Sequence, residues 1–268
     1  MANFSILLAA SMEKKAGGNP FAPDMFDYRS SNTFNYFHEL NPERRTLISA
    51  LHEAMESGKN LKKIIGLAGE ALEKAVEVNL ELFNAPLMSA LDRYSPGVLF
   101  SAMNFHGLPT GAQRRLLENG IIFSGLFGIL RPDDLIPNYY LDYSSSIPGI
   151  GSVSDYWRKR MSGLLNERLH SKYVWNLLPG SYADSWDDEH TYGEMVKVEF
   201  AVDSRGKRTF LEEGPLAGQF INFVVKEAAE DLESARVWVH SEGYKFDADA
   251  EQFDEETRVR RIVYAKRA

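Results

Sequence analysis

Residues 121–141 read Ile-Ile-Phe-Ser-Gly-Leu-Phe-Gly-Ile-Leu-Arg-Pro-Asp-Asp-Leu-Ile-Pro-Asn-Tyr-Tyr-Leu. This stretch opens with an apolar run to Leu130 that is interrupted by Ser124, Gly125 and Gly128. Such a run predicts a buried strand, and glycines inside it indicate that another backbone or a ligand comes very close.

Polar and aromatic side chains follow where the apolar run ends, namely Arg131, Asp133, Asp134, Tyr139 and Tyr140. One interpretation is a binding site, because an arginine, two carboxylates and two phenols gather at the end of a core element. The other is a buried strand whose arginine pairs with its own aspartates. The residues alone leave both open.

Composition sets further limits on the chain of 268 residues. Without cysteine there is no disulfide framework, no thiolate metal site and no cysteine nucleophile. The apolar run 4–10 is too short for a signal peptide or a membrane span, so we expect a buried strand, a cytoplasmic location and no membrane contact. The net charge of −8 argues against a general nucleic-acid binder, although a local basic cleft stays compatible with it.

Helix and strand patterns are mixed along the chain and predict an α+β (mixed α/β) fold, with residues 1–268 as a single domain around a central mixed sheet. The apolar and alternating segments predict strands at 4–10, 173–177, 195–202, 207–211, 237–240 and 259–265. Helix starts, stops and periodicity predict helices at 41–57, 110–119, 153–169 and 218–233.

Several kinds of chemistry lack a motif. No P-loop and no Gly-x-Ser-x-Gly is present, so neither an NTPase nor an α/β-hydrolase has direct support. Metal-ligand types stand close together in 187–190, but such clusters are usually solvated, and we expect neither a metal nor another cofactor.

A set of polar residues stands at the exits of predicted core elements: Ser11, Lys14, Arg131, Tyr139, Asn176 and Tyr182. In an open sheet, ligands gather where strand ends face solvent. Arginine and lysine would neutralise an anion there, while serine, asparagine and tyrosine would orient it. Glu242 is either a base or the partner of Lys14.

The run 124–132, Ser-Gly-Leu-Phe-Gly-Ile-Leu-Arg-Pro, with Asp134, Ile136-Pro137 and Tyr139, resembles the signature of the YaaA family of peroxide-stress proteins. Further blocks of that family occur in the right order over nearly the whole chain: Ser11 with Lys14, Tyr156-Trp157, Asn176-Leu177 with Tyr182, and Ser241-Glu242-Gly243-Tyr244-Lys245-Phe246. The resemblance implies the YaaA-like fold with one polar cleft. It also implies a role in peroxide stress that limits free iron, and binding to duplex or branched DNA.

The resemblance completes the candidate site. Lys14, Arg131, Tyr139 and Glu242 become the candidate catalytic residues, and the candidate ligand-binding residues are Ser11, Ser124, Asn176, Tyr182 and Tyr244. Residues 64–72 resemble a helix-hairpin-helix, a motif that can hold a phosphate. Ala68 stands where its second glycine is expected and the following helix is acidic, which favours a plain helix corner.

Departures from the family concern mainly its cations. Before the helix at 218–233 the family carries lysines and Arg-Gly, where this chain has Glu212-Glu213-Gly214-Pro215-Leu216-Ala217-Gly218, and the family's arginine after the tyrosine is Tyr140 here. Such losses should weaken phosphate binding by orders of magnitude. Three hypotheses follow: a stress-related protein that binds DNA, a diverged enzyme acting on a small anionic or nucleobase-like molecule held by Lys14, Arg131 and Tyr139, and a relative that keeps only the fold.

Overall fold

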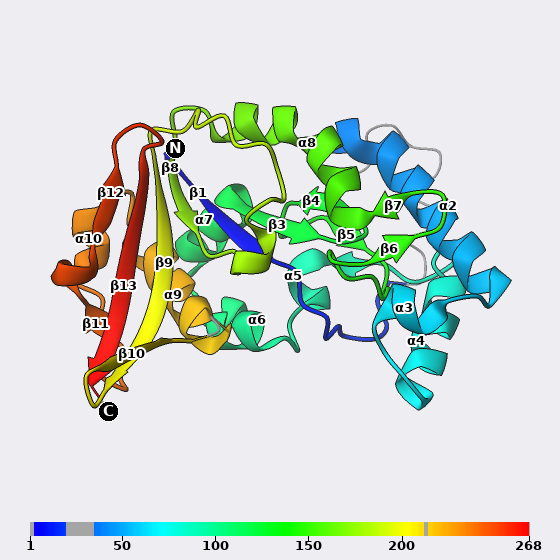
Figure 1. Ribbon diagram of the computed structural model, residues 1–268, viewed down its shortest axis with the longest axis horizontal. Helices are drawn as coiled ribbons and strands as arrows, with labels where there is room; N and C mark the ends of the chain where they lie inside the picture. Colours follow the sequence, from blue (N-terminus) through cyan, green and yellow to red (C-terminus); the bar gives the residue numbers. More distant parts are fainter. Residues whose placement is uncertain (1–2, 20–34, 212–213, 268) are drawn as a thin grey trace.

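The computed structural model describes residues 3–19, 35–211 and 214–267 (Figure 1). At its centre is a mixed sheet in the order β11-β13-β9-β8-β1-β3-β4, with β10 beside β9 and β12 beside β13. The strands are β1 (Phe4–Ala9), β3 (Gly120–Ser124), β4 (Gly128–Leu130), β8 (Tyr173–Asn176), β9 (Glu194–Ser204), β10 (Lys207–Phe210), β11 (Lys245–Phe246), β12 (Gln252–Asp254) and β13 (Val259–Arg267). The predicted mixed α/β fold around a central mixed sheet is confirmed.

Five strands of the sheet form parallel pairs with their neighbours, namely β1, β3, β8, β9 and β13. Their carboxyl ends therefore meet at one edge of the sheet, which we call the carboxyl edge. β1 lies between β3 and β8 and its side chains from Phe4 to Leu8 are buried. The apolar run at 4–10 forms a central strand because both of its faces are covered.

The apolar run at 121–130 forms two strands, not one. β3 ends at Ser124, and β4 returns beside it in the antiparallel direction. The two glycines of the turn permit close approach, as the sequence predicts. A Cβ at Gly125 would lie 2.7 Å from the carbonyl oxygen of Leu141, and one at Gly128 would lie 2.7 Å from the Trp157 ring.

Helices surround the sheet (Figure 1). They are α2 (Asn41–Ser57), α3 (Leu61–Ile65), α4 (Glu70–Leu80), α5 (Ala90–Arg93), α6 (Val98–Met103), α7 (Thr110–Asn119), α8 (Val153–Leu169), α9 (Gly214–Glu227) and α10 (Leu232–Arg236). Shorter elements are the 3₁₀ turns η1 (His38–Leu40), η2 (Phe105–Gly107), η3 (Gly180–Tyr182) and η4 (Ala248–Ala250), and the small sheets of β2 (Met88–Ser89) with β5 (Leu135–Ile136) and β6 (Ser146–Ile147) with β7 (Gly151–Ser152).

The predicted helices at 41–57, 110–119 and 153–169 are confirmed as α2, α7 and α8. The helix predicted at 218–233 is wrong in extent, because Ala228 adopts a left-handed φ of 52° and the segment divides into α9 and α10. The strand predicted at 237–240 is also wrong. Only Val239 makes a single β-bridge, to Lys245, and Val237 is 71% exposed.

Helix α9 packs on the sheet through Phe220, whose ring contacts Trp175 of β8 and Tyr264 of β13. Gly218 allows α6 to cross α9 closely, because a Cβ there would lie 2.1 Å from the carbonyl oxygen of Leu99. Within the described ranges, no helix combines the length and the apolar character that crossing a bilayer requires.

Candidate functional site

The segment that leaves β1 at the carboxyl edge is fixed by Arg93 of α5, which is fully buried. Its guanidinium donates to the carbonyl oxygens of Lys15, Pro86 and Ile136, and its own carbonyl oxygen accepts the N–H of Lys15 at 2.7 Å. A single side chain therefore ties the backbone next to Lys14 to two other segments. This fixes the position from which the Lys14 side chain extends.

The Lys14 ammonium lies against aromatic rings. Its Nζ is 4.2 Å from the ring centroid of Tyr139 and 5.7 Å from those of Tyr94 and Tyr140. Its hydrogen bond goes to the carbonyl oxygen of Met12, at 3.4 Å, and no carboxylate of the described residues forms an ion pair with it. Ring faces attract a cation but replace little of its lost hydration.

Burial therefore lowers the pKa of Lys14 from 10.5 to about 7. The carboxylate of Asp142 acts in the opposite direction, and the positive charge of Arg93 adds to the lowering. Near neutral pH the amine is consequently divided between its charged and uncharged forms. Such a lysine can bind an anion, and it can also accept a proton.

The hydroxyl of Tyr139 links three side chains. It lies 2.7 Å from the hydroxyl of Tyr94 and 2.7 Å from Oγ of Ser124, and that Oγ accepts the N–H of Phe127 at 3.2 Å. All of these hydroxyls are buried. Burial raises the pKa of Tyr139 and of Tyr94, so both phenols stay protonated and can donate.

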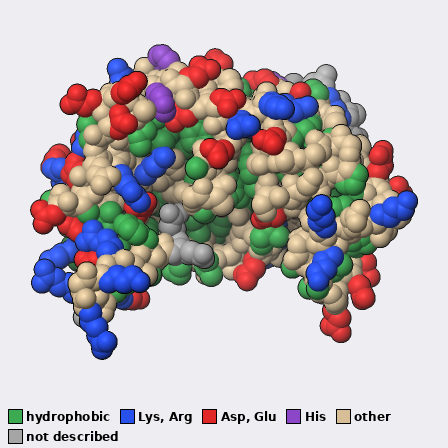
Figure 2. Space-filling view, in the orientation of Figure 1, with side chains coloured by type: hydrophobic (Ala, Val, Ile, Leu, Met, Phe, Trp, Pro, Cys, Tyr) green, Lys and Arg blue, Asp and Glu red, His purple; other side chains and the backbone are tan. Residues whose placement is uncertain are grey.

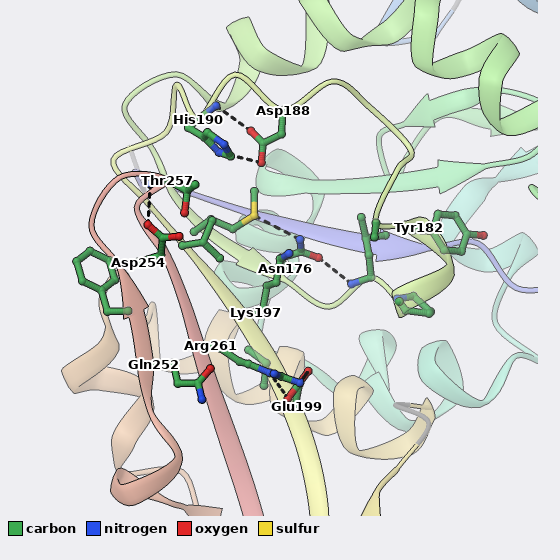
Figure 3. Close-up of a pocket in the computed structure, with 18 of the residues that line it drawn as sticks. Asn176, Tyr182, Asp188, His190, Lys197, Glu199, Gln252, Asp254, Thr257 and Arg261 are labelled. Atoms are coloured by element: carbon green, nitrogen blue, oxygen red, sulfur yellow. Dashed lines mark hydrogen bonds and ion pairs between the residues drawn. The ribbon is translucent and has the colours of Figure 1, made fainter.

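Tyr182 of η3 completes what we call the Lys14 cluster, which consists of Lys14, Tyr94, Ser124, Tyr139, Asp142 and Tyr182. In Figure 3 its hydroxyl points away from the groove that the other labelled residues line. Burial and the charge of Asp142 raise the pKa of Tyr182, as they do for Tyr139. Tyr182 thus lines the groove and is also influenced by Asp142 and Tyr139 of the Lys14 cluster.

The groove of Figure 3, about 740 Å³ in volume, lies over β8, β9, β12 and β13. Asn176 lines it at the end of β8, where its Oδ1 accepts the N–H of Leu178 at 3.0 Å. Lys197 and Arg261 come from neighbouring positions of β9 and β13. Arg261 is held by two bonds of 2.6 Å to Glu199.

Ser11 lines a second groove, of about 570 Å³, at the ends of β1 and β8. Its Oγ accepts the N–H of Glu13 at 3.1 Å. Gly97 allows this placement, because a Cβ there would lie 2.1 Å from that Oγ. The structure therefore brings Lys14, Ser124, Tyr139 and Tyr182 together, with Ser11 and Asn176 at adjoining grooves; that list covers six of the nine candidate residues.

Arg131 does not join this group. It follows Leu130, which pairs with Ile122, so β4 carries it toward the amino end of β3. There its guanidinium pairs with Asp133, which raises the pKa of Arg131, and the backbone N–H of Arg131 donates to Oδ2 of Asp134 at 2.8 Å. The interpretation in which the arginine pairs with its own aspartate describes these contacts.

Glu242 and Tyr244 lie beside the carboxyl end of β13, which β9 and β8 separate from β1 in the sheet. The exposed carboxylate of Glu242 accepts a bond of 2.8 Å from Nζ of Lys266, so Lys266 and not Lys14 is its partner. The same Nζ lies 4.5 Å from the ring centroid of Tyr244, which is buried. Glu212 and Glu213, two of the departures from the family pattern, lie outside the described residues.

Three members or supports of the cluster were missed from the sequence: Arg93, Tyr94 and Asp142. No signal in the sequence marked Tyr94. Asp142 directly follows the stretch 121–141. Arg93 acts only through backbone carbonyls, and no local pattern marks such a role.

The fold and the site together define a mixed α/β protein with a lysine-bearing polar cluster at the carboxyl edge of parallel strands. The family model of the peroxide stress protein YaaA matches residues 5–250, and the chain belongs to this family.

Curated relatives agree with this assignment. A UPF0246 protein of Streptomyces coelicolor is 34% identical over 125 residues, 47% of each chain. One of Corynebacterium glutamicum is 30% identical over 179 residues, 66% of this chain and 67% of the relative. One of Clostridium beijerinckii is 26% identical over 235 residues, 81% of this chain and 89% of the relative. The chain thus matches about half the length of the Streptomyces relative.

Proposed function

We propose that this protein acts in the cytoplasmic response to peroxide that gives its family its name, and that it does so by binding a small anionic or nucleobase-like molecule at the Lys14 cluster. The observation that carries the proposal is the Lys14 ammonium, which lies against Tyr139 without a carboxylate partner among the described residues. A cation that is desolvated and unpaired is stabilised by an incoming anion.

The surrounding groups suit such a ligand. The phenol of Tyr182 stays protonated and can donate a hydrogen bond, and half-buried Tyr140 offers a ring for a flat ligand. Binding an anion raises the pKa of Lys14, so the complex takes up a proton near neutral pH.

A thermal-stability screen of the full chain tests the proposal, with inorganic phosphate, carboxylates, free nucleobases and nucleotides as probes. We expect at least one probe to stabilise the wild type, and Lys14→Met to abolish the effect. Lys15→Met is the matched control, because this substitution removes the same charge one residue away and Lys15 is exposed. Equal stabilisation of wild type and Lys14→Met, or none by any probe, contradicts the proposal.

The cellular role needs a separate measurement. Cells that lack the protein should lose viability in hydrogen peroxide and regain it with the wild-type chain but not with Lys14→Met. An enzymatic role also has an observation in its favour, since an amine with a pKa of about 7 can act as a base at neutral pH. Incubating the stabilising probe with wild type and Lys14→Arg, followed by mass spectrometry, shows whether it is converted.

Direct DNA binding is a second candidate, which one surface favours. Arg205, Lys207, Arg208 and Arg267 surround a concave surface at the β9–β10 turn, and Figure 2 shows Lys and Arg side chains gathered at its lower left. The α3–α4 corner is less suited, because Glu70, Glu73, Glu77 and Glu81 are all exposed there. Cations dominate DNA affinity.

Fluorescence anisotropy with duplex and four-way-junction DNA across salt concentrations separates these candidates. Binding that falls steeply with salt and weakens in Arg205→Gln/Lys207→Gln supports a DNA-binding role. Flat anisotropy at low salt excludes it and leaves the small-molecule proposal untouched.

A further inference from the structure

A second cationic site lies at the edge of the sheet opposite the Lys14 cluster, around Tyr36. The ring of Tyr36 is 39% exposed, and two guanidinium groups lie beside it, at 4.9 Å for Arg131 and 5.3 Å for Arg168. The backbone N–H of Tyr36 bonds Oδ1 of Asp134 at 2.7 Å. Asp134, in the segment that follows β4, therefore fixes the backbone of Tyr36. The face of the Tyr36 ring attracts both guanidinium groups.

Arg168 of α8 is positioned but not satisfied. Its Nη2 donates to the carbonyl oxygen of Glu118 at 3.2 Å, whereas its buried Nε–H has no acceptor among the described residues. Buried donors without an acceptor are rare and costly. That Nε is shielded from solvent, so the part of Arg168 that can meet a ligand is the terminal end of its guanidinium, which lines a pocket.

Lys172, just before β8, adds a second positive charge that no nearby carboxylate of the described residues neutralises. Burial lowers its pKa from 10.5 to about 8, and the positive charge of Arg168 contributes in the same direction. No carboxylate of the described residues offsets this effect, although Glu39 and Glu167 line the same pocket. Two cations that disfavour each other's charge call for an anion between them.

Both side chains line one pocket of about 530 Å³, which we call the Tyr36 pocket. Its titratable lining residues are Tyr36, His38, Glu39, Glu167, Arg168, His170 and Lys172. The volume suits a small molecule. A guanidinium matches the geometry of phosphate oxygens, and a lysine ammonium adds a point charge.

We propose that the Tyr36 pocket binds a phosphate group, either free phosphate or the phosphate of a small monoester, between Arg168 and Lys172. Arg131 acts in this site as a positioning residue, because it is paired with Asp133 and reaches the pocket only through the Tyr36 ring. The site is independent of the proposed ligand at Lys14.

Isothermal titration calorimetry of the full chain at low ionic strength tests the site with inorganic phosphate and AMP as probes. We expect saturable binding of one equivalent, weakened roughly tenfold or more by Arg168→Gln and by Lys172→Met. Lys159→Met is the matched control, because Lys159 is an exposed cation of the same helix α8. Lys14→Met should leave this binding unchanged, which separates its failure from failure of the proposed function.

The dependence on pH adds a signature that a merely structural lysine does not produce. Between pH 8 and pH 9.5 phosphate stays a dianion, and carboxylates and histidines in general do not titrate. As Lys172 loses its proton, affinity should fall roughly tenfold in the wild type and little in Lys172→Arg.

Tighter binding of AMP than of phosphate identifies a monoester as the ligand, and equal affinities identify free phosphate. Three results overturn the site: no saturable binding, equal losses in Lys159→Met and Lys172→Met, or wild-type affinity in a folded Arg168→Gln. Near-ultraviolet circular dichroism verifies folding of each variant.

Discussion

Nζ of Lys14 lies 4.2 Å from the ring centroid of Tyr139, and the hydroxyl of that same tyrosine is hydrogen-bonded to Tyr94 and Ser124. The ring thus contacts a partly desolvated amine with its face while its hydroxyl is held by the core. Because the core fixes the ring, the amine cannot regain hydration without leaving it. This relationship gives the lysine a pH-dependent effect on stability.

Replacing Lys14 by Met should change how the free energy of unfolding depends on pH. The folded pKa of Lys14, about 7, lies below its unfolded value of 10.5, so the unfolded chain binds the additional proton between these values. Stability from this group therefore rises with pH across the window. Urea denaturation at pH 7 and pH 9 should show a rise larger by about 2 kcal/mol in wild type than in Lys14→Met. Lys15→Met should keep the wild-type slope, and parallel slopes for wild type and Lys14→Met would mean that the amine is hydrated.

Removing the Tyr139 hydroxyl should leave buried partners unsatisfied. Tyr139→Phe takes the bonds of 2.7 Å from both Tyr94 and Ser124, which should lower the free energy of unfolding by about 1–3 kcal/mol. The double variant Tyr94→Phe/Tyr139→Phe should lose less stability than the sum of the single variants, because either single substitution already breaks the bond between the two hydroxyls. Urea denaturation of the four chains in the cycle measures this coupling, and strict additivity would show that the hydroxyls act independently.

Much of this site could be predicted because parallel strands end at one edge. Lys14 and Ser124 each follow or end a strand that the apolar pattern marks, and Asn176 ends another. The sequence places Arg131 with them because the apolar run 121–130 predicts a single strand. The chain reverses after Ser124, and this reversal carries Arg131 to the opposite edge. Apolar periodicity does not reveal a reversal inside a buried run, since both strands are equally apolar.

Other features depend on contacts between segments far apart in the chain. Arg93 holds carbonyls of residues 15, 86 and 136, and its own surroundings in the sequence carry no trace of that role. The end of α9 depends on the left-handed Ala228, a conformation that alanine rarely adopts and that helix propensity does not predict.

The turn between β3 and β4 offers a test of close packing. Gly128 has a φ of +71°, and a Cβ there would lie 2.7 Å from Trp157. Trp157 cannot move easily, because its Nε1–H donates to the carbonyl oxygen of Gly125 at 2.8 Å. Gly128→Ala should therefore cost about 3 kcal/mol or more of stability, from backbone strain and steric overlap together. Gly149→Ala controls for the strain alone, since Gly149 has a φ of +80° with no atom within 4 Å of the added Cβ, and it should cost about 1 kcal/mol. Similar losses of thermal stability in the two variants would refute the proposed overlap with Trp157.

The outer edge of the sheet depends on one buried arginine, Arg44 of α2. Its Nε donates to the carbonyl oxygen of Phe127 at 3.0 Å, its Nη2 to that of Ile129 at 2.7 Å, and its Nη1 to Oδ1 of Asn41 at 2.9 Å. Burial lowers the pKa of Arg44 to about 10, and Asp134 acts against this lowering.

Because β4 has no strand beyond it in the described sheet, these bonds take the place of a further strand. Arg44→Met leaves the carbonyls of Phe127, in the turn, and of Ile129, in β4, without this donor and should cost about 3–5 kcal/mol in urea denaturation. A lysine has one ammonium group and cannot reach both carbonyls as the planar guanidinium does, so Arg44→Lys should recover only a small part of the lost stability. The comparison variant Arg114→Met removes an exposed arginine that pairs with Glu118 on α7, and it should cost under about 1 kcal/mol. If Arg44→Met proved as mild as Arg114→Met, the edge of β4 would have to be stabilised by packing and not by these hydrogen bonds.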